Sequence, residues 1–192
     1  ADLGLGRTWE LRETLREDLW LVVMSATLDA APVAALLNDA PIVTSAGRSF
    51  PVELTYLPRP APKDLPFEAQ ARNLIMQALA DTEGGLLVFL PGEAEIRRTK
   101  AALQNHLPKN CVLRLLLGNL PFAEQQLAIQ PEAQKNMRKI VLATAIAETS
   151  LTIQDIRVVV DCGRALRARY VSSKGLQKLV TERVSKAEAT QR

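Results

Sequence analysis

The stretch LLVFLPGEAEIRRTKAALQNH, residues 86–106, decides how this chain folds. Its first five residues are all apolar, which is typical of a strand buried on both faces of a parallel sheet. Pro91 and Gly92 then end the strand, and residues 93–106 are predicted to form a helix. A strand, a sharp turn and a helix in this order form half of a βαβ unit.

The same alternation extends over the second part of the chain. We expect helices at 67–81 and from Pro121 to about Ile129, and strands at 112–116, 139–142 and 157–160. Strands that alternate with helices of about 10–15 residues indicate βαβ units and a parallel sheet. The predicted fold class is therefore α/β.

The first part of the chain has fewer strand signals. Leu21–Met24 and residues 42–43 are predicted to be short strands, and a helix is expected from Ala30 to Leu37. So few strands cannot build a parallel sheet covered on both faces. We therefore interpret residues 1–57 as the C-terminal portion of a domain whose beginning lies elsewhere.

A proline-rich stretch separates the two parts. Residues 58–66, PRPAPKDLP, contain four prolines, which fix the backbone and remove hydrogen-bond donors. We expect a stiff, extended connector here and a second domain over residues 67–192.

Composition excludes several classes of protein. Of the 192 residues, 47% are hydrophobic and 23% charged, as in a globular protein. No apolar run reaches the ~18–20 residues of a membrane span. Two cysteines cannot build a disulfide framework, and the single histidine argues against a His-rich metal site or a Ser-His-Asp triad. We interpret the two cysteines as buried, reduced thiols and expect a cytoplasmic protein. The N-terminus has neither Met nor a signal-like leader, and we expect a sequence cut from a longer one.

The charge is unevenly distributed. The net charge is +3, but residues 157–192 carry nine lysines and arginines against three acids, and the rest is slightly acidic. This pattern favours a phosphate-binding edge near the C-terminus. The alternative interpretation is that Arg164, Arg167 and Arg169 lie in a soluble, solvent-exposed loop that binds nothing.

Polar residues follow three of the predicted strands. They are Ser25-Ala26-Thr27, Pro91-Gly92 and the stretch from Thr144 to Ser150. In open α/β sheets ligands bind at the carboxyl ends of strands, and hydroxyls and free backbone N–H groups suit phosphate oxygens. Each signal alone is weak, and Ser25–Thr27 could be a plain turn. The sequence contains no GxxxxGK[ST] loop and no carboxylate pair that could hold Mg²⁺ beside one.

The order of the motifs is more specific than any one of them. The chain resembles the DEAH-box superfamily 2 ATP-dependent RNA helicases, most closely their bacterial HrpB type. The resemblance covers the whole chain and rests on L-V-V-M-S-A-T-L-D (21–29), G-R-S-F-P-V-E (47–53), L-L-V-F-L-P-G-E-A-E-I (86–96), L-G-N-L-P-F-A-E-Q (117–125), I-V-L-A-T-A-I-A-E-T-S-L-T-I (140–153), V-V-V-D-C-G (158–163) and Q-R (191–192).

The resemblance implies a parallel-sheet RecA-like fold of two domains, with ATP and RNA in the cleft between them. It also implies that the chain begins after the DEAH motif and ends inside a motif that reads QRxGRxGR in the family. ATP and Mg²⁺ are then expected in the intact parent, and the 192 residues alone are expected to be inactive. The expected partners are an RNA or possibly DNA backbone and the remaining parts of the parent chain.

The resemblance also assigns roles to residues that match the family's motifs. Ser25 and Thr27 fill the motif that couples hydrolysis to strand separation, and Gln191 fills a position that senses the ATP phosphates. The positions expected to contact nucleic acid are Arg48, Pro91, Gly92, Thr144, Glu148 and Thr149. Binding through hydroxyls and backbone N–H groups should not depend on base sequence.

Some positions depart from the family's pattern. Ala145 stands where Asn is usual, Leu117 where Tyr is common, and Gln154-Asp155 where an acid and Gly are expected, which puts a nucleotide-ribose contact in doubt. These departures keep an alternative open: a non-catalytic nucleic-acid-binding or interaction module that kept the fold. Arg48 could also be a solvated turn residue, and Glu148 could merely brace its loop.

Overall fold

The chain divides into two compact units, Ala1–Tyr56 and Leu57–Arg192. The computed structural model describes residues 2–24, 30–45, 50–59, 61–62, 64–134, 136–147, 152–171 and 175–192. In those ranges no helix is long and apolar enough to cross a membrane. The second unit contains the sheet and the candidate site.

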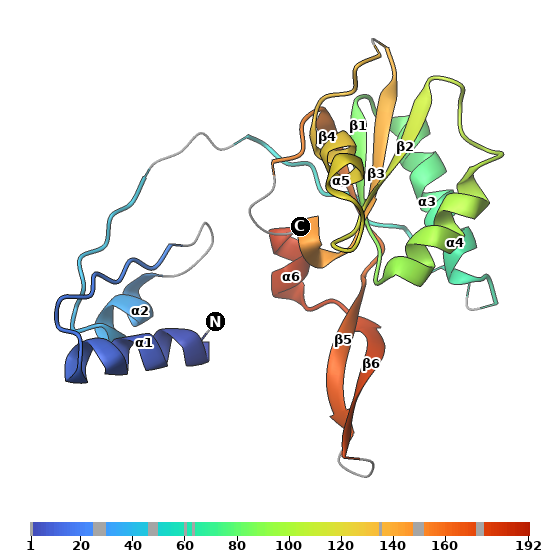
Figure 1. Cartoon of the computed structure of the whole chain (residues 1–192). Coiled ribbons are helices and arrows are strands. Elements are labelled where there is room, and N and C mark those ends of the chain that lie inside the picture. The colour runs from blue at the N-terminus through green and yellow to red at the C-terminus, as the bar shows by residue number, and fades with distance from the viewer. Residues whose placement is uncertain are drawn as a thin grey trace. The chain divides into compact units, whose positions relative to one another are not determined.

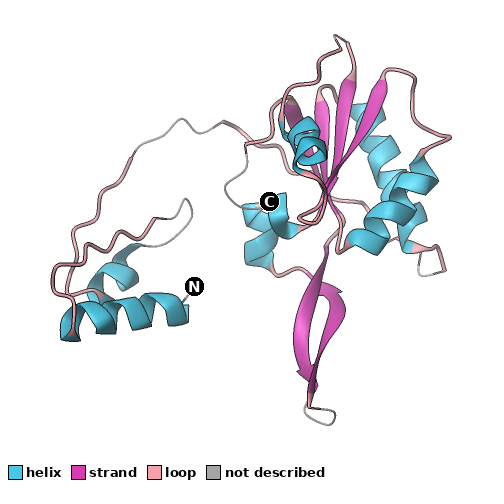
Figure 2. Cartoon of the chain, viewed as in Figure 1, coloured by secondary structure: helices cyan, strands magenta, loops and turns pink. Residues whose placement is uncertain are grey.

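The first unit contains two helices, α1 (Asp2–Thr14) and α2 (Ala30–Leu36) (Figure 2). The strands predicted at 21–24 and 42–43 are wrong: the residues there are irregular and mostly exposed, with Val43 at 93%. An isolated strand leaves its N–H and C=O groups without ladder partners. The described part of the first unit supplies no strand to pair with them.

The second unit is built on a four-stranded sheet of β1 (Gly85–Phe89), β2 (Cys111–Leu116), β3 (Arg138–Ala143) and β4 (Ile156–Asp161). The spatial order is β2-β3-β1-β4, and every neighbouring pair is parallel. Leu86 of β1 is in register with Ile140 of β3 on one side and Val158 of β4 on the other. The predicted parallel α/β sheet is therefore confirmed, with strand ends within one residue of those expected.

Helices cover both faces of this sheet. Figure 1 shows α3 (Phe67–Asp81) and α4 (Glu93–Leu103) on one side and α5 (Phe122–Ile129) on the other. Burial on both faces explains why β1 is apolar at every position. The core on the α3–α4 side includes Ile75, Leu79, Leu86, Val88, Ile96, Leu103, Ile140 and Leu142, and that on the α5 side includes Leu87, Phe89, Leu116, Ala128 and Val141.

A second, antiparallel element follows the sheet. Strands β5 (Arg164–Val171) and β6 (Leu176–Arg183) form a hairpin that extends away from the sheet, and the short helix α6 (Lys186–Gln191) lies near its base (Figure 1). The alternative of a soluble loop for the arginines at 164–169 is therefore wrong. Arg169 forms a 2.7 Å ion pair with Glu182 across the hairpin, and Arg167 forms one with Glu188 of α6.

Candidate functional site

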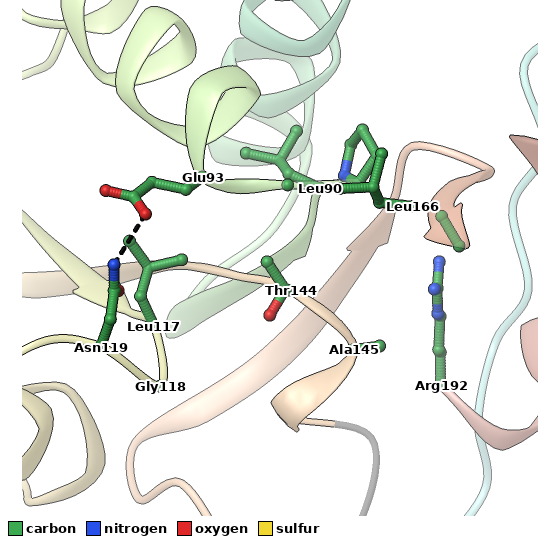
Figure 3. Close-up of a pocket in the computed structure, with 12 residues that line it drawn as sticks. Leu90, Glu93, Leu117, Gly118, Asn119, Thr144, Ala145, Leu166 and Arg192 are labelled. Atoms are coloured by element: carbon green, nitrogen blue, oxygen red, sulfur yellow. Dashed lines mark hydrogen bonds between the residues drawn. The ribbon is translucent and has the colours of Figure 1, made fainter. Parts of the chain in front are cut away.

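The carboxyl ends of the parallel strands surround a hollow of about 310 Å³. The loops that follow β1, β2 and β3 form most of its wall, and the start of β5 and the last residue complete it. Because parallel strands all end at one edge, segments far apart in sequence meet here. Figure 3 shows Thr144 near the middle, with Glu93 and Asn119 on one side and Arg192 on the other.

Pro91 and Gly92 form the wall that follows β1. Gly92 is extended, with φ −160°, and is the N-cap of α4. A Cβ at this position would lie 3.1 Å from Oε2 of Glu95 and 3.3 Å from Cδ2 of Leu166. The missing side chain therefore lets the loop pack against β5. The start of α4 has no side-chain cap for its first N–H groups, and the Glu95 carboxylate lies beside them.

Thr144 follows β3 directly and is half-buried in the same hollow. Its carbonyl oxygen accepts a 3.2 Å hydrogen bond from the N–H of Ala147, which begins a 3₁₀ turn over Ala145–Ala147. Ala145 also lines the hollow. The structure thus brings together Pro91, Gly92 and Thr144, which the sequence predicted at the ends of separate strands.

The other predicted site residues cannot be placed in this hollow. The backbone of Gln191 lies in α6, one residue before Arg192, which lines the hollow. Five predicted positions lie outside the described residues: Ser25, Thr27, Arg48, Glu148 and Thr149.

A polar link in one wall of the hollow was not predicted. Nδ2 of Asn119, in the loop after β2, donates a 2.8 Å hydrogen bond to Oε2 of Glu93 at the start of α4. Oε1 of Glu93 accepts from Nη2 of Arg97 at 2.6 Å. Hydrogen bonds from Arg97 and Asn119 hold the pKa of Glu93 below its usual range, so the hollow contains a carboxylate at neutral pH. The two partners are 26 residues apart, and no local pattern indicates their contact.

A second unpredicted feature is the anchoring of Arg192. Its Nη1 donates a 2.7 Å hydrogen bond to Oδ1 of Asp161 at the end of β4, and its guanidinium lies 4.9 Å from the ring centre of Phe89. The side chain is 2% exposed. This arginine lines the hollow while it is held by Asp161 and Phe89 of the same chain.

The amino ends of the strands also surround a hollow, and two of the cations that line it, Arg138 and Lys139, donate to backbone carbonyl oxygens. Lys139, 1% exposed, donates a 2.6 Å hydrogen bond to the carbonyl oxygen of Gln130 after α5. Arg138 donates to the carbonyl oxygens of Leu79 and Gly84. Burial lowers the pKa of Lys139, and nearby acids oppose that shift. Nη1 and Nε of Arg138 and Nζ of Lys139 thus donate to backbone carbonyl oxygens, whereas Nη2 of Arg138 is buried without a hydrogen-bond partner.

The described residues contain no group of three His, Cys, Asp or Glu side chains that could hold a metal ion. The described residues at the carboxyl edge offer side-chain hydroxyl and amide donors and backbone N–H donors. Such donors suit phosphate oxygens.

Comparison with known proteins gives a family match. The model described as the helicase conserved C-terminal domain matches residues 70–177. This range includes β1–β4, the hollow's loops and the first strand of the hairpin.

Relatives match over the full length of the chain. It is 46% identical over 192 residues to the ATP-dependent RNA helicase HrpB of Escherichia coli (strain K12), of which it spans 23%. Human ATP-dependent RNA helicase DHX33 is 37% identical over 91% of the chain, which spans 25% of that protein. A crystal structure of the E. coli DExH-box NTPase HrpB matches all of the chain with a TM-score of 0.88 and is covered to 23%. These matches confirm the resemblance that the ordered motifs indicated.

Proposed function

The chain belongs to the helicase conserved C-terminal domain family, and we propose that it is part of an ATP-dependent RNA helicase core that holds an RNA backbone without reading its bases. The observation that carries the proposal is the meeting of Pro91, Gly92 and Thr144 in one hollow at the carboxyl edge of the sheet. The three loops there offer donors for phosphate oxygens, and backbone contacts carry no base information.

Each group in the hollow has a role in this proposal. The free N–H groups at the start of α4, beside Gly92, bind a phosphate oxygen, and the partial positive charge of the helix end favours it. The hydroxyl of Thr144 donates to the same or the neighbouring phosphate. Glycine at 92 lets the strand approach the backbone closely.

The remaining assignments rest on the resemblance. Residues 1–57 would be the end of a first RecA-like domain and residues 67–192 most of a second, joined by the connector at 58–66. Ser25 and Thr27 would link hydrolysis to strand movement, and Gln191 would sense ATP phosphates. Arg48, Glu148 and Thr149 would extend the RNA contact. We also place the protein in the cytoplasm, in agreement with two free thiols.

ATP and Mg²⁺ enter the proposal only through a longer protein. The chain spans about a quarter of its curated relatives, and its own sequence lacks a GxxxxGK[ST] loop. When bound, Mg²⁺-ATP would supply the phosphoryl group whose transfer to water drives the motion. The 192 residues alone should therefore bind RNA but show no RNA-stimulated ATPase activity.

The test is a binding titration and an ATPase assay on the 192-residue chain. A labelled single-stranded RNA should bind regardless of base sequence, and Thr144→Ala should weaken binding about three- to tenfold by removing one donor to a charged phosphate. Thr82→Ala, after α3 at the opposite edge of the sheet, is the matched control and should leave affinity unchanged. Undetectable RNA binding, or ATP turnover above background, would refute the proposal.

Ala145 favours a second candidate, a nucleic-acid-binding module without turnover. Its methyl group lines the hollow where the family's Asn would add polar donors and an acceptor. The coding sequence that precedes residue 1 discriminates between the two. Intact GxxxxGK[ST] and Asp-Glu-x-His motifs would support the helicase, and degenerate versions of both would support the binding module.

A further inference from the structure

The hollow proposed to take a phosphate has a carboxylate in its wall. Glu93 and Asn119 both line it, and the 2.8 Å hydrogen bond between them joins the loops after β1 and β2 (Figure 3). The second oxygen of Glu93 is held by Arg97, one turn further along α4. Contacts on both oxygens fix the carboxylate beside the positions where a strand would pass.

We propose that Glu93 is an affinity-limiting residue. It lowers the affinity of the hollow for a nucleic-acid phosphate, so that the strand can be released. The inference rests on the proposed function, because it concerns the same hollow. It adds a residue that opposes binding to the groups that favour it.

The first argument is competition for a donor. The Asn119 N–H that points at Glu93 cannot serve a phosphate oxygen at the same time. A phosphate that takes this donor must displace the carboxylate, and two anions cannot occupy the same donor position. Glu93 therefore takes up one of the two side-chain N–H donors of Asn119, so this side of the hollow has one donor fewer for a phosphate.

The second argument is charge. A hollow of about 310 Å³ is only roughly 8 Å across, so a phosphate within it lies inside one Debye length of Glu93 at physiological salt. The ion pair with Arg97 is exposed to solvent and offsets part of this repulsion. Like charges at such a distance near a protein surface change affinity by about three- to tenfold at low salt.

A purely structural role makes a different prediction. An acid in the first turn of α4 that pairs with an arginine four residues later stabilises the helix slightly. If that were its whole effect, removing the charge would lower thermal stability a little and leave RNA affinity unchanged.

The test is Glu93→Gln in the 192-residue chain, which keeps an oxygen that can accept from Asn119. Its affinity for a short single-stranded RNA at low salt should rise about three- to tenfold. The gain should shrink as salt is added and disappear with an oligonucleotide whose linkages are uncharged methylphosphonates. Glu83→Gln, which removes the same charge at the opposite edge of the sheet, should have no effect.

The outcomes separate this inference from the proposed function. The role assigned to Glu93 is wrong if the wild-type chain binds RNA but Glu93→Gln binds it no more tightly. It is also wrong if the affinity of Glu93→Gln rises equally for uncharged linkages. In both cases the hollow remains the proposed RNA site. If the wild-type chain binds no RNA, the proposed function fails, and the role of Glu93 fails with it.

Discussion

Replacing Asp161 by Asn should destabilise the second unit, because it removes the carboxylate that accepts a hydrogen bond from the buried guanidinium of Arg192. Oδ1 of Asp161 accepts from Arg192 at 2.7 Å and from the N–H of Gly163 at 2.8 Å. Breaking one side of a buried charge pair costs about 3–5 kcal/mol. Arg192 follows a helix of six residues, which can undock and return the cation to water. We therefore expect a loss at the lower end of this range, about 3 kcal/mol.

The measurement must report on the second unit. Trp9 and Trp20 both lie in the first unit, so tryptophan fluorescence would miss the effect. Native-state hydrogen exchange of the β1 and β4 amides measures the free energy of opening directly. Asp81→Asn, at the exposed end of α3, is the control and should change stability by less than about 0.5 kcal/mol.

A double-mutant cycle decides whether the pair is responsible. The second change is Arg192→Gln. The double variant should lose less stability than the sum of the losses of the two single variants, by about 1 kcal/mol or more. Strict additivity, or a loss below about 0.5 kcal/mol for Asp161→Asn, would refute the reasoning.

Three further predictions concern the frame around the site. Gly85→Ala should cost about 2 kcal/mol or more in urea unfolding followed by circular dichroism, because its Cβ would lie 2.5 Å and 3.0 Å from two backbone oxygens. Gly4→Ala, with nothing within 4 Å, should be neutral or stabilising. Hydrogen bonds from its N-cap serine lower the pKa of Glu188 from 4.5, so its contribution is complete above that pH and lost as pH falls through the folded pKa. The protection factors of α6 should therefore drop below pH 4.5, and Glu188→Gln should remove that dependence. Burial raises the pKa of Cys162 to about 12, so an alkylating reagent at pH 8 should modify it in urea but not in the native chain, as mass spectrometry of its peptide would show.

Burial explains which elements could be predicted. Strands β1 and β3 are covered on both faces, so the continuous apolar runs at 86–90 and 139–142 indicated them clearly. The hairpin has no such pattern: Tyr170 and Leu179 are exposed on one face, and Arg167 and Lys178 lie on the other. With neither face buried, no alternation of apolar and polar residues marks its strands.

The strands predicted at 21–24 and 42–43 are wrong for a different reason: the local pattern is present, but the described residues of the first unit include no partner strands. The run Leu21–Met24 has the composition of a buried strand, but composition predicts a strand only if neighbours exist to pair with it. In the described part of the first unit none do. A local pattern cannot tell whether the sheet that a segment would join is present in the same stretch of chain.

The site was predictable as far as topology determines it. Residues that follow parallel strands must meet at one edge, which placed Gly92 beside Thr144 before any coordinates were known. The contact between Glu93 and Asn119 depends on side chains from two loops, and so does that between Arg192 and Asp161. Such contacts follow from the packing of the whole sheet and leave no local signal in the sequence.

The ion pairs within the basic C-terminal stretch change how its charge is interpreted. Its excess of cations favoured an electrostatic edge for phosphates, but Arg167, Arg169 and Arg192 are paired with acids of the same stretch. Among described residues of the hairpin, Arg164, Lys178 and Arg183 form no ion pair with an acid, and Arg164 lies over the ring of Phe67. Charge therefore contributes less to the hollow than the sequence suggests, and neutral donors contribute more. In the site that we propose, N–H and hydroxyl groups supply most of the donors, so the charge of Glu93 is offset chiefly by its own ion pair with Arg97.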